Sequence, residues 1–248
     1  DRFVHEAAGA AADAENQKTA EFLNKIACRD RAYLKKEADR LHGIIGGKIP
    51  VLPPDTLEVD YEVIPVMIMD GCIYRCKFCC FKNDSDLTIR NDSDIRKQLY
   101  NLKNFYGEDI INYNSIVLGQ NDAFAAGADK VHFAAMTAYD ILSLKDSYHH
   151  GANLFAFASV DSLLDTDPAL FRKLDKSPYY THINIGLESP CQEGLDIIGK
   201  PLTAKKVLEA FKYAGEINKK YDSVRVTCNF LLAERFPRSH IEGIKKLL

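Results

Sequence analysis

The sequence predicts an α/β fold in which a parallel sheet, covered by helices, forms an incomplete barrel behind an N-terminal helical extension. From Val63 onward, short apolar segments alternate with longer segments of helical periodicity, which is the pattern of repeated strand–helix units. The short segments are apolar throughout, as expected for strands buried on both faces of a parallel sheet. Five such units follow one another without a return strand, and a chain of 248 residues has room for one barrel-sized domain or two small ones.

The N-terminal part is predicted to be helical and to end in a linker, so that residues 1–56 precede a barrel over residues 57–248. Helix propensity and the spacing of apolar residues predict helices over Glu6–Glu15 and Thr19–Leu41. Residues 49–56 contain three prolines, so we expect a linker that cannot be helical. The whole extension is expected to pack on the outside or the end of the barrel.

The barrel part contains five predicted strands and the helices that follow them. The strands are predicted at Val63–Met69, Ser115–Leu118, Leu154–Val160, Thr181–Leu187 and Ser223–Leu232. The helices are predicted at Ile95–Tyr106, Asp129–Leu144, Pro168–Asp175, Gln192–Ile198 and Ala204–Tyr221, with a last one that begins near Ser239.

Composition excludes several classes of function. The chain is 46% hydrophobic and 27% charged, which is ordinary for a globular protein. Its net charge of −3 gives no electrostatic reason to expect a nucleic-acid or anionic-membrane partner. No apolar run approaches the ~20 residues of a membrane helix, and no signal peptide is visible. Seven cysteines, an odd number, indicate a reducing compartment, so we expect a cytoplasmic protein.

Cys72, Cys76 and Cys79 form a C-x3-C-x2-C motif directly after the first predicted strand. Iron–sulfur clusters are usually held by four thiolates, so three on one loop could leave one iron of a cubane cluster open to a small molecule. The same thiols could instead bind zinc, with Cys80 or a distant residue as the fourth ligand, although zinc sites usually contain a second cysteine pair. The scattered cysteines are interpreted as structural thiols: Cys28, Cys191 and Cys228.

The cysteine motif resembles that of the radical S-adenosylmethionine (radical SAM) superfamily, C-x3-C-x-aromatic-C, with Phe78 at the aromatic position. The resemblance extends over residues ~61–248 and implies a (β/α)6 partial barrel whose sixth strand would lie beyond Leu248, so that the barrel would be truncated here. It implies a [4Fe-4S] cluster on the three cysteines and S-adenosylmethionine (SAM) on the open iron. The reduced cluster would cleave SAM to a 5′-deoxyadenosyl radical, which abstracts hydrogen from an unidentified small-molecule or protein substrate. An electron donor such as flavodoxin or ferredoxin is implied as a partner.

Ligand-binding groups in parallel α/β barrels gather where strands end, which selects further candidates. Gly119, Gln120 and Asn121 follow the second predicted strand, where the superfamily has a Gly-Gly-Glu-like turn that holds the SAM amino group. Gln120 and Asn121 depart from that pattern. Ser159 and Asp161 follow the third strand and are candidates for the SAM ribose or for substrate, although Asp161 could equally cap the next turn.

The fourth strand ends in Gly186-Leu187-Glu188-Ser189. This ending resembles the branch that contains oxygen-independent coproporphyrinogen oxidases, methylthiotransferases and Elongator-subunit-three-like proteins, in which the acid contacts the SAM ribose or amino group. Lys200 falls where that branch often has a basic residue for the SAM carboxylate, but it could also be a solvated surface lysine. Asn229 and Leu231 lie where the branch packs adenine, and the backbone of Phe78 is implied as another adenine contact.

Two alternatives stay open. The chain could be a zinc-stabilised, non-catalytic barrel, or an activase whose substrate is a protein glycyl residue. Within the superfamily, a methylthiotransferase would be expected to carry a second set of three cysteines, and none is recognisable. A cobalamin-dependent enzyme would be expected to carry a cobalamin-binding segment before the barrel, and none is recognisable. The histidines His132, His149, His150 and His182 lack metal-ligand spacing and are interpreted as structural.

Overall fold

The computed structural model describes residues 2–49, 51–59, 61–74, 76–79, 87–119 and 121–247. The chain divides into two compact units, Asp1–Lys48 and Ile49–Leu248, which we call unit 1 and unit 2. The proline-rich residues 49–56, which we predicted to be a linker, are therefore counted with unit 2. Among the described residues, no helix combines the length and apolar character that a bilayer crossing requires.

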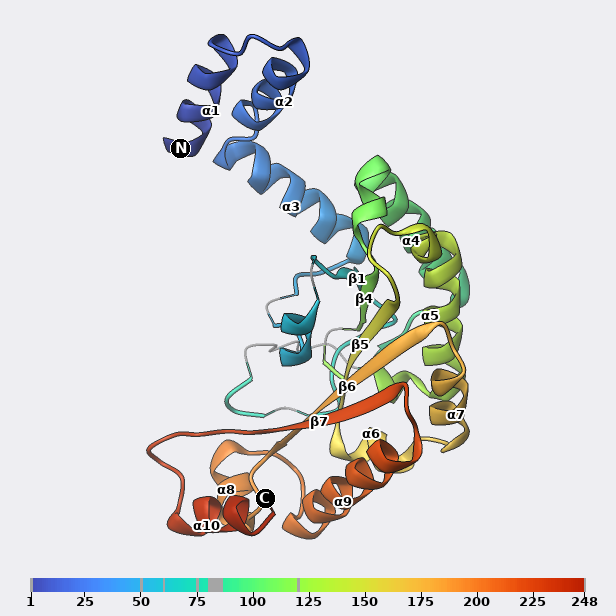
Figure 1. The fold of residues 1–248 in the computed structure, drawn as a ribbon. Helices are drawn as coiled ribbons and strands as arrows, with labels where there is room; N and C mark the ends of the chain where they lie inside the picture. The colour runs from blue at the N-terminus through green and yellow to red at the C-terminus, as the bar shows by residue number, and fades with distance from the viewer. Residues whose placement is uncertain are drawn as a thin grey trace. The chain divides into compact units, whose positions relative to one another are not determined.

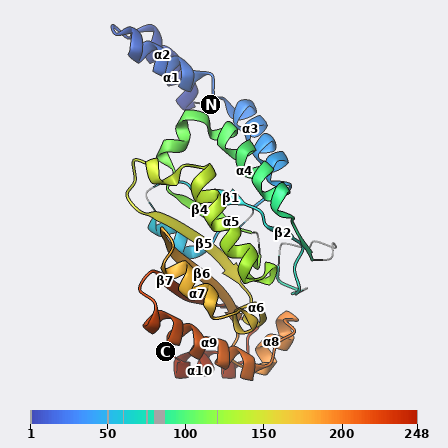
Figure 2. The ribbon, with the colours of Figure 1, turned by 90° about the vertical axis from the view of Figure 1, so that its right-hand side faces the viewer.

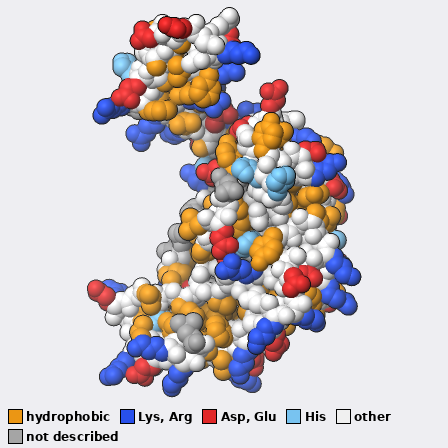
Figure 3. All heavy atoms as spheres, in the orientation of Figure 1, with side chains coloured by type: hydrophobic (Ala, Val, Ile, Leu, Met, Phe, Trp, Pro, Cys, Tyr) orange, Lys and Arg blue, Asp and Glu red, His pale blue; other side chains and the backbone are white. Residues whose placement is uncertain are grey.

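Unit 1 consists of three helices, α1 (Arg2–Ala12), α2 (Gln17–Ala27) and α3 (Arg31–Ile45). The single helix predicted over Thr19–Leu41 is wrong, because Asp30 accepts a hydrogen bond from the Tyr33 amide and begins a new helix. Hydrophobic side chains appear on the surface of α1 and α2 in Figure 3, and the most exposed large ones of the unit are Phe3, Phe22 and Leu34.

Unit 2 is built on a five-stranded parallel sheet, which confirms the predicted α/β class (Figure 1). The strands are adjacent in the same order as in the sequence, so each connection leads to the next position in the sheet. This is the arrangement of an open partial barrel. The strands are β1 (Ile64–Val66), β4 (Ser115–Leu118), β5 (Ala152–Ala158), β6 (Tyr179–Glu188) and β7 (Val224–Phe230).

Helices cover one face of the sheet, as Figures 1 and 2 show for α4, α5 and α7. On α4, Ile95, Leu99 and Leu102 repeat at helical spacing and are fully buried. Unit 2 also contains short 3-10 helices at Gly107–Asn112 (η2), Ala123–Ala126 (η3) and Leu144–Asp146 (η4). The α-helices of unit 2 are α4 (Asp92–Tyr106), α5 (Ala128–Ile141), α6 (Val160–Asp165), α7 (Ala169–Asp175), α8 (Gln192–Ile198), α9 (Ala204–Lys220) and α10 (Arg238–Leu247).

The first strand is shorter than predicted because a side chain takes over its hydrogen bonding. Gln98 of α4 accepts a hydrogen bond of 2.8 Å from the Met67 amide and donates one of 2.9 Å to the Met67 carbonyl. Gln98 is buried, and it takes the place of a neighbouring strand, since none pairs with this edge of the sheet in the part of the chain that the structure describes. Beyond Met67 the chain turns into β2 (Met69–Asp70), which pairs antiparallel with β3 (Thr88–Ile89).

The described residues of the proline-rich segment, Ile49 and residues 51–59, lie against the sheet face opposite α5 (Figure 1). It contains a 3-10 helix, η1 (Pro54–Glu58), so the prediction that residues 49–56 cannot be helical is wrong for residues 54–56. Pro54 takes the first position of this helix, where a missing amide hydrogen costs nothing. Ile49 and Val59 pack against a buried cluster of Val63, Val117 and Phe155. The segment is thus part of the barrel interior and not a free linker.

We expect Gln98→Met to lower the free energy of unfolding by about 1–3 kcal/mol, because two buried polar groups of Met67 lose their partners. Urea unfolding followed by circular dichroism measures this change. Lys97→Met, at the adjacent exposed position of the same helix, serves as the control and should shift stability by no more than about 0.5 kcal/mol. Equal effects of the two substitutions would show that the Gln98 amide does not complete the sheet edge.

Candidate functional site

A cavity of about 380 Å³ lies at the carboxyl ends of the strands of unit 2. It is lined by all three cysteines of the motif and by seven of the residues predicted to bind SAM: Phe78, Asn121, Ser159, Glu188, Lys200, Asn229 and Leu231. Gly119 and Asp161 are not on its wall, and Gln120 lies outside the described residues. The wall also contains residues to which the sequence assigned no cofactor contact: Val51, Tyr74, Asp122, Phe157, Ala158, Asn184 and Gly186.

The loop that carries the cysteines is fixed at its base and along its length. Arg90 binds both carboxylate oxygens of Asp70, at 2.8 and 2.6 Å, and so closes the loop where β2 meets β3. Further along, the Lys77 amide donates a 2.9 Å hydrogen bond to the carbonyl of Ile198, at the end of α8. These contacts hold the cysteine loop against the strand ends.

The thiols of the motif are partly enclosed. Burial raises the pKa of both Cys72 and Cys76, while the Lys200 ammonium acts in the opposite direction. The Tyr74 amide also donates to the Cys72 sulfur at 3.4 Å, which favours the thiolate. Among the described residues, no three His, Cys, Asp or Glu side chains converge as ligands of a single metal ion. Three separate thiols around one cavity, with an ammonium nearby, fit a cluster in which each thiolate binds its own iron.

Tyr74 connects the cysteine loop to two helices through Asp161. The Tyr74 hydroxyl donates a 2.5 Å hydrogen bond to one Asp161 oxygen, and Lys206 of α9 binds the other oxygen at 2.5 Å. Partial burial works to raise the pKa of Asp161, but the hydrogen bonds from Lys206 and Tyr74 outweigh it and hold that pKa below its usual value. Burial and the Asp161 carboxylate raise the pKa of Tyr74, so the phenol stays protonated and donates. We call Tyr74, Asp161 and Lys206 the loop clamp.

Two buried oxygen atoms beside the cysteines have no hydrogen-bond partner among the described residues. Asp122 accepts a 2.6 Å bond from Ser162 at one oxygen, but its other oxygen is unpaired. The side-chain oxygen of Asn121 is unpaired as well. A buried acceptor without a donor costs about 1–3 kcal/mol, so this side of the cavity suits a ligand that brings N–H donors or a positive charge.

Glu188 and Lys200 form a buried ion pair on the cavity wall. The Lys200 ammonium lies 3.1 Å from the Glu188 carboxylate, and the side chains are 5% and 10% exposed. Glu188 has a left-handed backbone with φ of 63°, next to an irregularity in the pairing of β6 with β7. Its carboxylate folds back over Gly186, where an added Cβ would lie 2.2 Å from the Glu188 oxygen. Glycine at position 186 therefore makes room for this charge pair.

His240, a residue that the sequence did not single out, fastens the strand ends to α10. It is fully buried, and its ring nitrogens lie 2.9 Å from the Ser189 hydroxyl and 2.8 Å from the Leu231 carbonyl. The Leu231 amide in turn donates to the Glu188 carbonyl at 3.0 Å. Glu188, which ends β6, and Leu231, which follows β7, are thus held together in the cavity wall.

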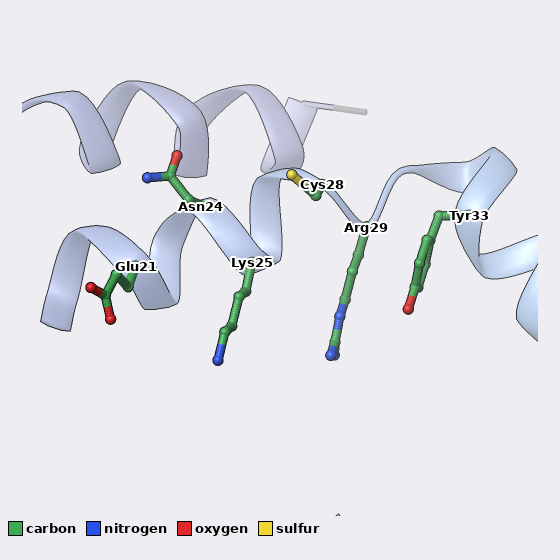
Figure 4. A pocket seen from close by; sticks show the side chains of 6 residues that line it. All are labelled: Glu21, Asn24, Lys25, Cys28, Arg29 and Tyr33. Atoms are coloured by element: carbon green, nitrogen blue, oxygen red, sulfur yellow. The ribbon is translucent and has the colours of Figure 1, made fainter. Parts of the chain in front are cut away.

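Unit 1 contains a separate hollow of about 660 Å³, shown in Figure 4. Glu21, Lys25, Arg29 and Tyr33 extend to one side of it, and Asn24 and Cys28 point away from them. The lining side chains are polar and mostly exposed, with charges of both signs. This is the character of a solvated helix surface, and we assign the chemistry to the cavity of unit 2.

Comparisons with known proteins place the barrel in a family. The radical SAM superfamily model matches residues 66–248. Among solved structures, the chain is similar to the apo form of OxsB, described as a cobalamin-dependent S-adenosylmethionine radical enzyme, with a TM-score of 0.51 and 14% sequence identity. The similarity covers 78% of this chain and 27% of OxsB, so the chain spans about a quarter of that protein, and it bears on the fold alone. No curated protein matches the chain.

We expect Tyr74→Phe to loosen the cysteine loop, because the substitution removes the hydroxyl that binds Asp161. A hydrogen bond to a charged group contributes roughly 1 kcal/mol or more, so amides of residues 71–79 should exchange with deuterium about fivefold faster or more. Hydrogen exchange read by mass spectrometry measures the rate. Tyr100→Phe, at an exposed position on α4, is the matched control. Unchanged exchange in Tyr74→Phe would mean that the clamp does not hold the loop.

Proposed function

This chain belongs to the radical SAM superfamily, and we propose that Cys72, Cys76 and Cys79 bind one [4Fe-4S] cluster whose fourth iron is left for SAM. Members of the superfamily are enzymes with these two cofactors, so the chain is an enzyme domain of this class. These three cysteines would hold the cluster, which when bound and reduced would supply the chemistry of reductive SAM cleavage and hydrogen abstraction. The observation that carries the proposal is a single cavity lined by three thiols, a buried ion pair and two unpaired acceptors.

Asn121 and Asp122 are proposed to receive the SAM ammonium group. Their unpaired oxygens need donors, and an ammonium group supplies three. The superfamily pattern has an acid in this turn, where the chain has Asn121; Asp122, one residue further along, would supply the missing charge. Gly119 follows β4 next to them and is proposed to contribute a backbone contact, whereas Gln120, predicted from the sequence to do the same, lies outside the described residues. Gly119 has a φ of 71°, which lets the chain turn sharply after β4.

Lys200 and Glu188 are proposed to bind the other polar parts of SAM. Lys200 would pair with the SAM carboxylate, and Glu188 would accept hydrogen bonds from the ribose hydroxyls or the amino group. Ser159 on the same wall could add a ribose contact. Phe78, Asn229 and Leu231 would then surround the adenine. Asp161 was predicted to contact SAM, but both of its oxygens are engaged in the loop clamp, so we propose that it acts by holding Tyr74.

The partners and the location are also proposals. Reductive cleavage needs an electron donor such as flavodoxin or ferredoxin. The six described cysteines are all free thiols, which supports a reducing location such as the cytoplasm. The substrate is a small molecule or a protein. Cobalamin dependence is a property of OxsB, and we do not propose it for this chain.

The anaerobically reconstituted chain should form 5′-deoxyadenosine when dithionite and SAM are added, and Cys76→Ala should not, because it loses one cluster ligand. Liquid chromatography with mass spectrometry measures the product, and iron analysis measures the cluster. Cys191→Ala removes a thiol outside the cavity and should keep both iron and activity. Stoichiometric zinc without iron and without 5′-deoxyadenosine would support the zinc-stabilised barrel instead.

We expect Lys200→Met to weaken SAM binding about tenfold or more with unchanged iron content, because a charge-assisted contact worth roughly 1.5–3 kcal/mol is lost. Calorimetric titration of the reconstituted protein measures the affinity, and Lys205→Met, on the exposed face of α9, is the control. Because Lys200→Met also leaves Glu188 buried without its partner, circular dichroism of the variant must first show that it is folded. Parent-like affinity in a folded Lys200→Met protein would remove Lys200 from the SAM site.

A further inference from the structure

Glu188, which lies on the cavity wall, is the central residue of a strained turn. The Ser189 amide donates a 2.8 Å hydrogen bond to the Leu187 carbonyl, so residues 187–189 form a γ-turn with Glu188 in the middle. Glu188 has a φ of 63°, and γ-turns with positive φ are rare and strained. A residue keeps such a conformation only where its surroundings hold it, so contacts from outside the turn must do so here.

His240 of α10 holds both flanks of this turn with one imidazole ring. The Leu231 carbonyl can only accept, so the ring carries a hydrogen on Nε2 and donates it at 2.8 Å. In this neutral tautomer Nδ1 accepts, and it receives the Ser189 hydroxyl at 2.9 Å. The Leu231 amide in turn donates to the Glu188 carbonyl at 3.0 Å. Each flank of Glu188 is therefore tied to the same ring, one side through Ser189 and the other through Leu231.

The imidazole ring is itself enclosed. His240 is fully buried, and its ring stacks on Phe236 with centroids 4.2 Å apart. Gly194 of α8 lies against the same group of side chains. An added Cβ at position 194 would lie 2.2 Å from the Ser189 hydroxyl oxygen and 3.2 Å from the Phe236 ring. Glycine at this position lets the turn, the ring and α8 pack closely.

The backbone of the turn decides where the Glu188 carboxylate lies. That carboxylate is now 3.1 Å from the Lys200 ammonium and folds back over Gly186. The direction of a side chain follows from its backbone dihedral angles, so a turn that relaxed to negative φ would carry the carboxylate away from Lys200. Hydrogen bonds weaken steeply with poor distance and angle, so a ligand that depends on Glu188 also depends on the turn.

We propose that His240 is a positioning residue for SAM binding: it holds the strained turn and thereby places the Glu188 carboxylate where SAM needs an acceptor. The inference rests on the proposed SAM site and adds to it a residue that does not touch the ligand. It also gives α10 a function in cofactor binding, although none of the residues Arg238–Leu247 lines the cavity.

The test measures the SAM affinity of the anaerobically reconstituted chain by calorimetric titration. His240→Phe keeps a buried ring but removes both hydrogen bonds, and we expect about tenfold weaker binding with unchanged iron content. Ser189→Ala removes only the bond between hydroxyl and imidazole and should weaken binding about threefold or more. His150→Phe makes the same exchange at an exposed position and should bind SAM like the parent.

A double-mutant comparison separates positioning from general destabilisation. Glu188→Ala removes the carboxylate, so adding His240→Phe to it should weaken SAM binding by a further factor of about two or less. Hydrogen exchange of the chain without cluster and SAM gives a second readout. The Leu231 amide should exchange about fivefold faster or more in His240→Phe, because the strand end that it fastens is no longer held.

The proposal is overturned if folded, iron-loaded His240→Phe or Ser189→Ala binds SAM as tightly as the parent, if the full loss persists beside Glu188→Ala, or if Leu231 exchange is unchanged. Circular dichroism checks folding, and Ser189→Ala with its Glu188→Ala combination decides the matter where His240→Phe does not fold. Parent-like affinity of Glu188→Ala alone would instead remove Glu188 from the SAM site. A parent that binds neither cluster nor SAM would remove the proposed function, and the inference would fall with it.

Discussion

All the chemistry of this chain depends on one constraint, the parallel pairing of five strands in sequence order. Parallel strands that are adjacent in sequence order end at the same edge of the sheet, so residues far apart in the chain meet there. The cysteine loop leaves the first strand, Asn121 follows β4, Ser159 follows β5, Glu188 ends β6 and Leu231 follows β7. No local interaction among these residues would bring them together. The register of the sheet does so, and Gln98 secures that register at the β1 edge, where no further strand pairs among the described residues.

The order of the strands could be predicted from the sequence because each combines an apolar run with polar residues that follow it, although β1, β5 and β7 end before their predicted last residues. β4 and α8 have the predicted bounds, and the α/β class is confirmed. The loop clamp and the hydrogen bond from Thr227 to Asp55 could not be predicted, because each joins side chains separated by many positions in the sequence and leaves no periodic signal. Asp161 also has an alternative local use as a cap, and only the contacts with Tyr74 and Lys206 show where its oxygens are engaged. The helix break at Asp30 leaves no signal in the spacing of apolar residues either. A single N-cap residue decides where α3 begins.

The cavity carries several features that lower stability. Glu188 is a non-glycine residue with a left-handed backbone, which costs roughly 1–2 kcal/mol, and it forms an ion pair away from water. Asp122 and Asn121 leave acceptors unpaired. Proteins tolerate such features where a ligand supplies the missing partners, since binding then recovers the cost. The same features would be a net loss in a barrel that served only as a scaffold. This is why the cavity, more than the fold, argues for a bound charged molecule.

The side chains of the cavity are held in two different ways, depending on whether they lie on a loop or on a strand. The cysteines are on a loop that needs external ties at Arg90, Lys77 and Tyr74, because a loop has no ladder of its own to hold it. Asn184 lies within a strand and Asn229 near the end of the next, where the backbone is already fixed, so their remaining freedom is the direction of the carboxamide. The Asp55 carboxylate can only accept hydrogen bonds, so Thr227 donates to it and accepts from Asn184, which in turn pairs with Asn229. Asp55 is supplied by a segment outside the residues that match the superfamily.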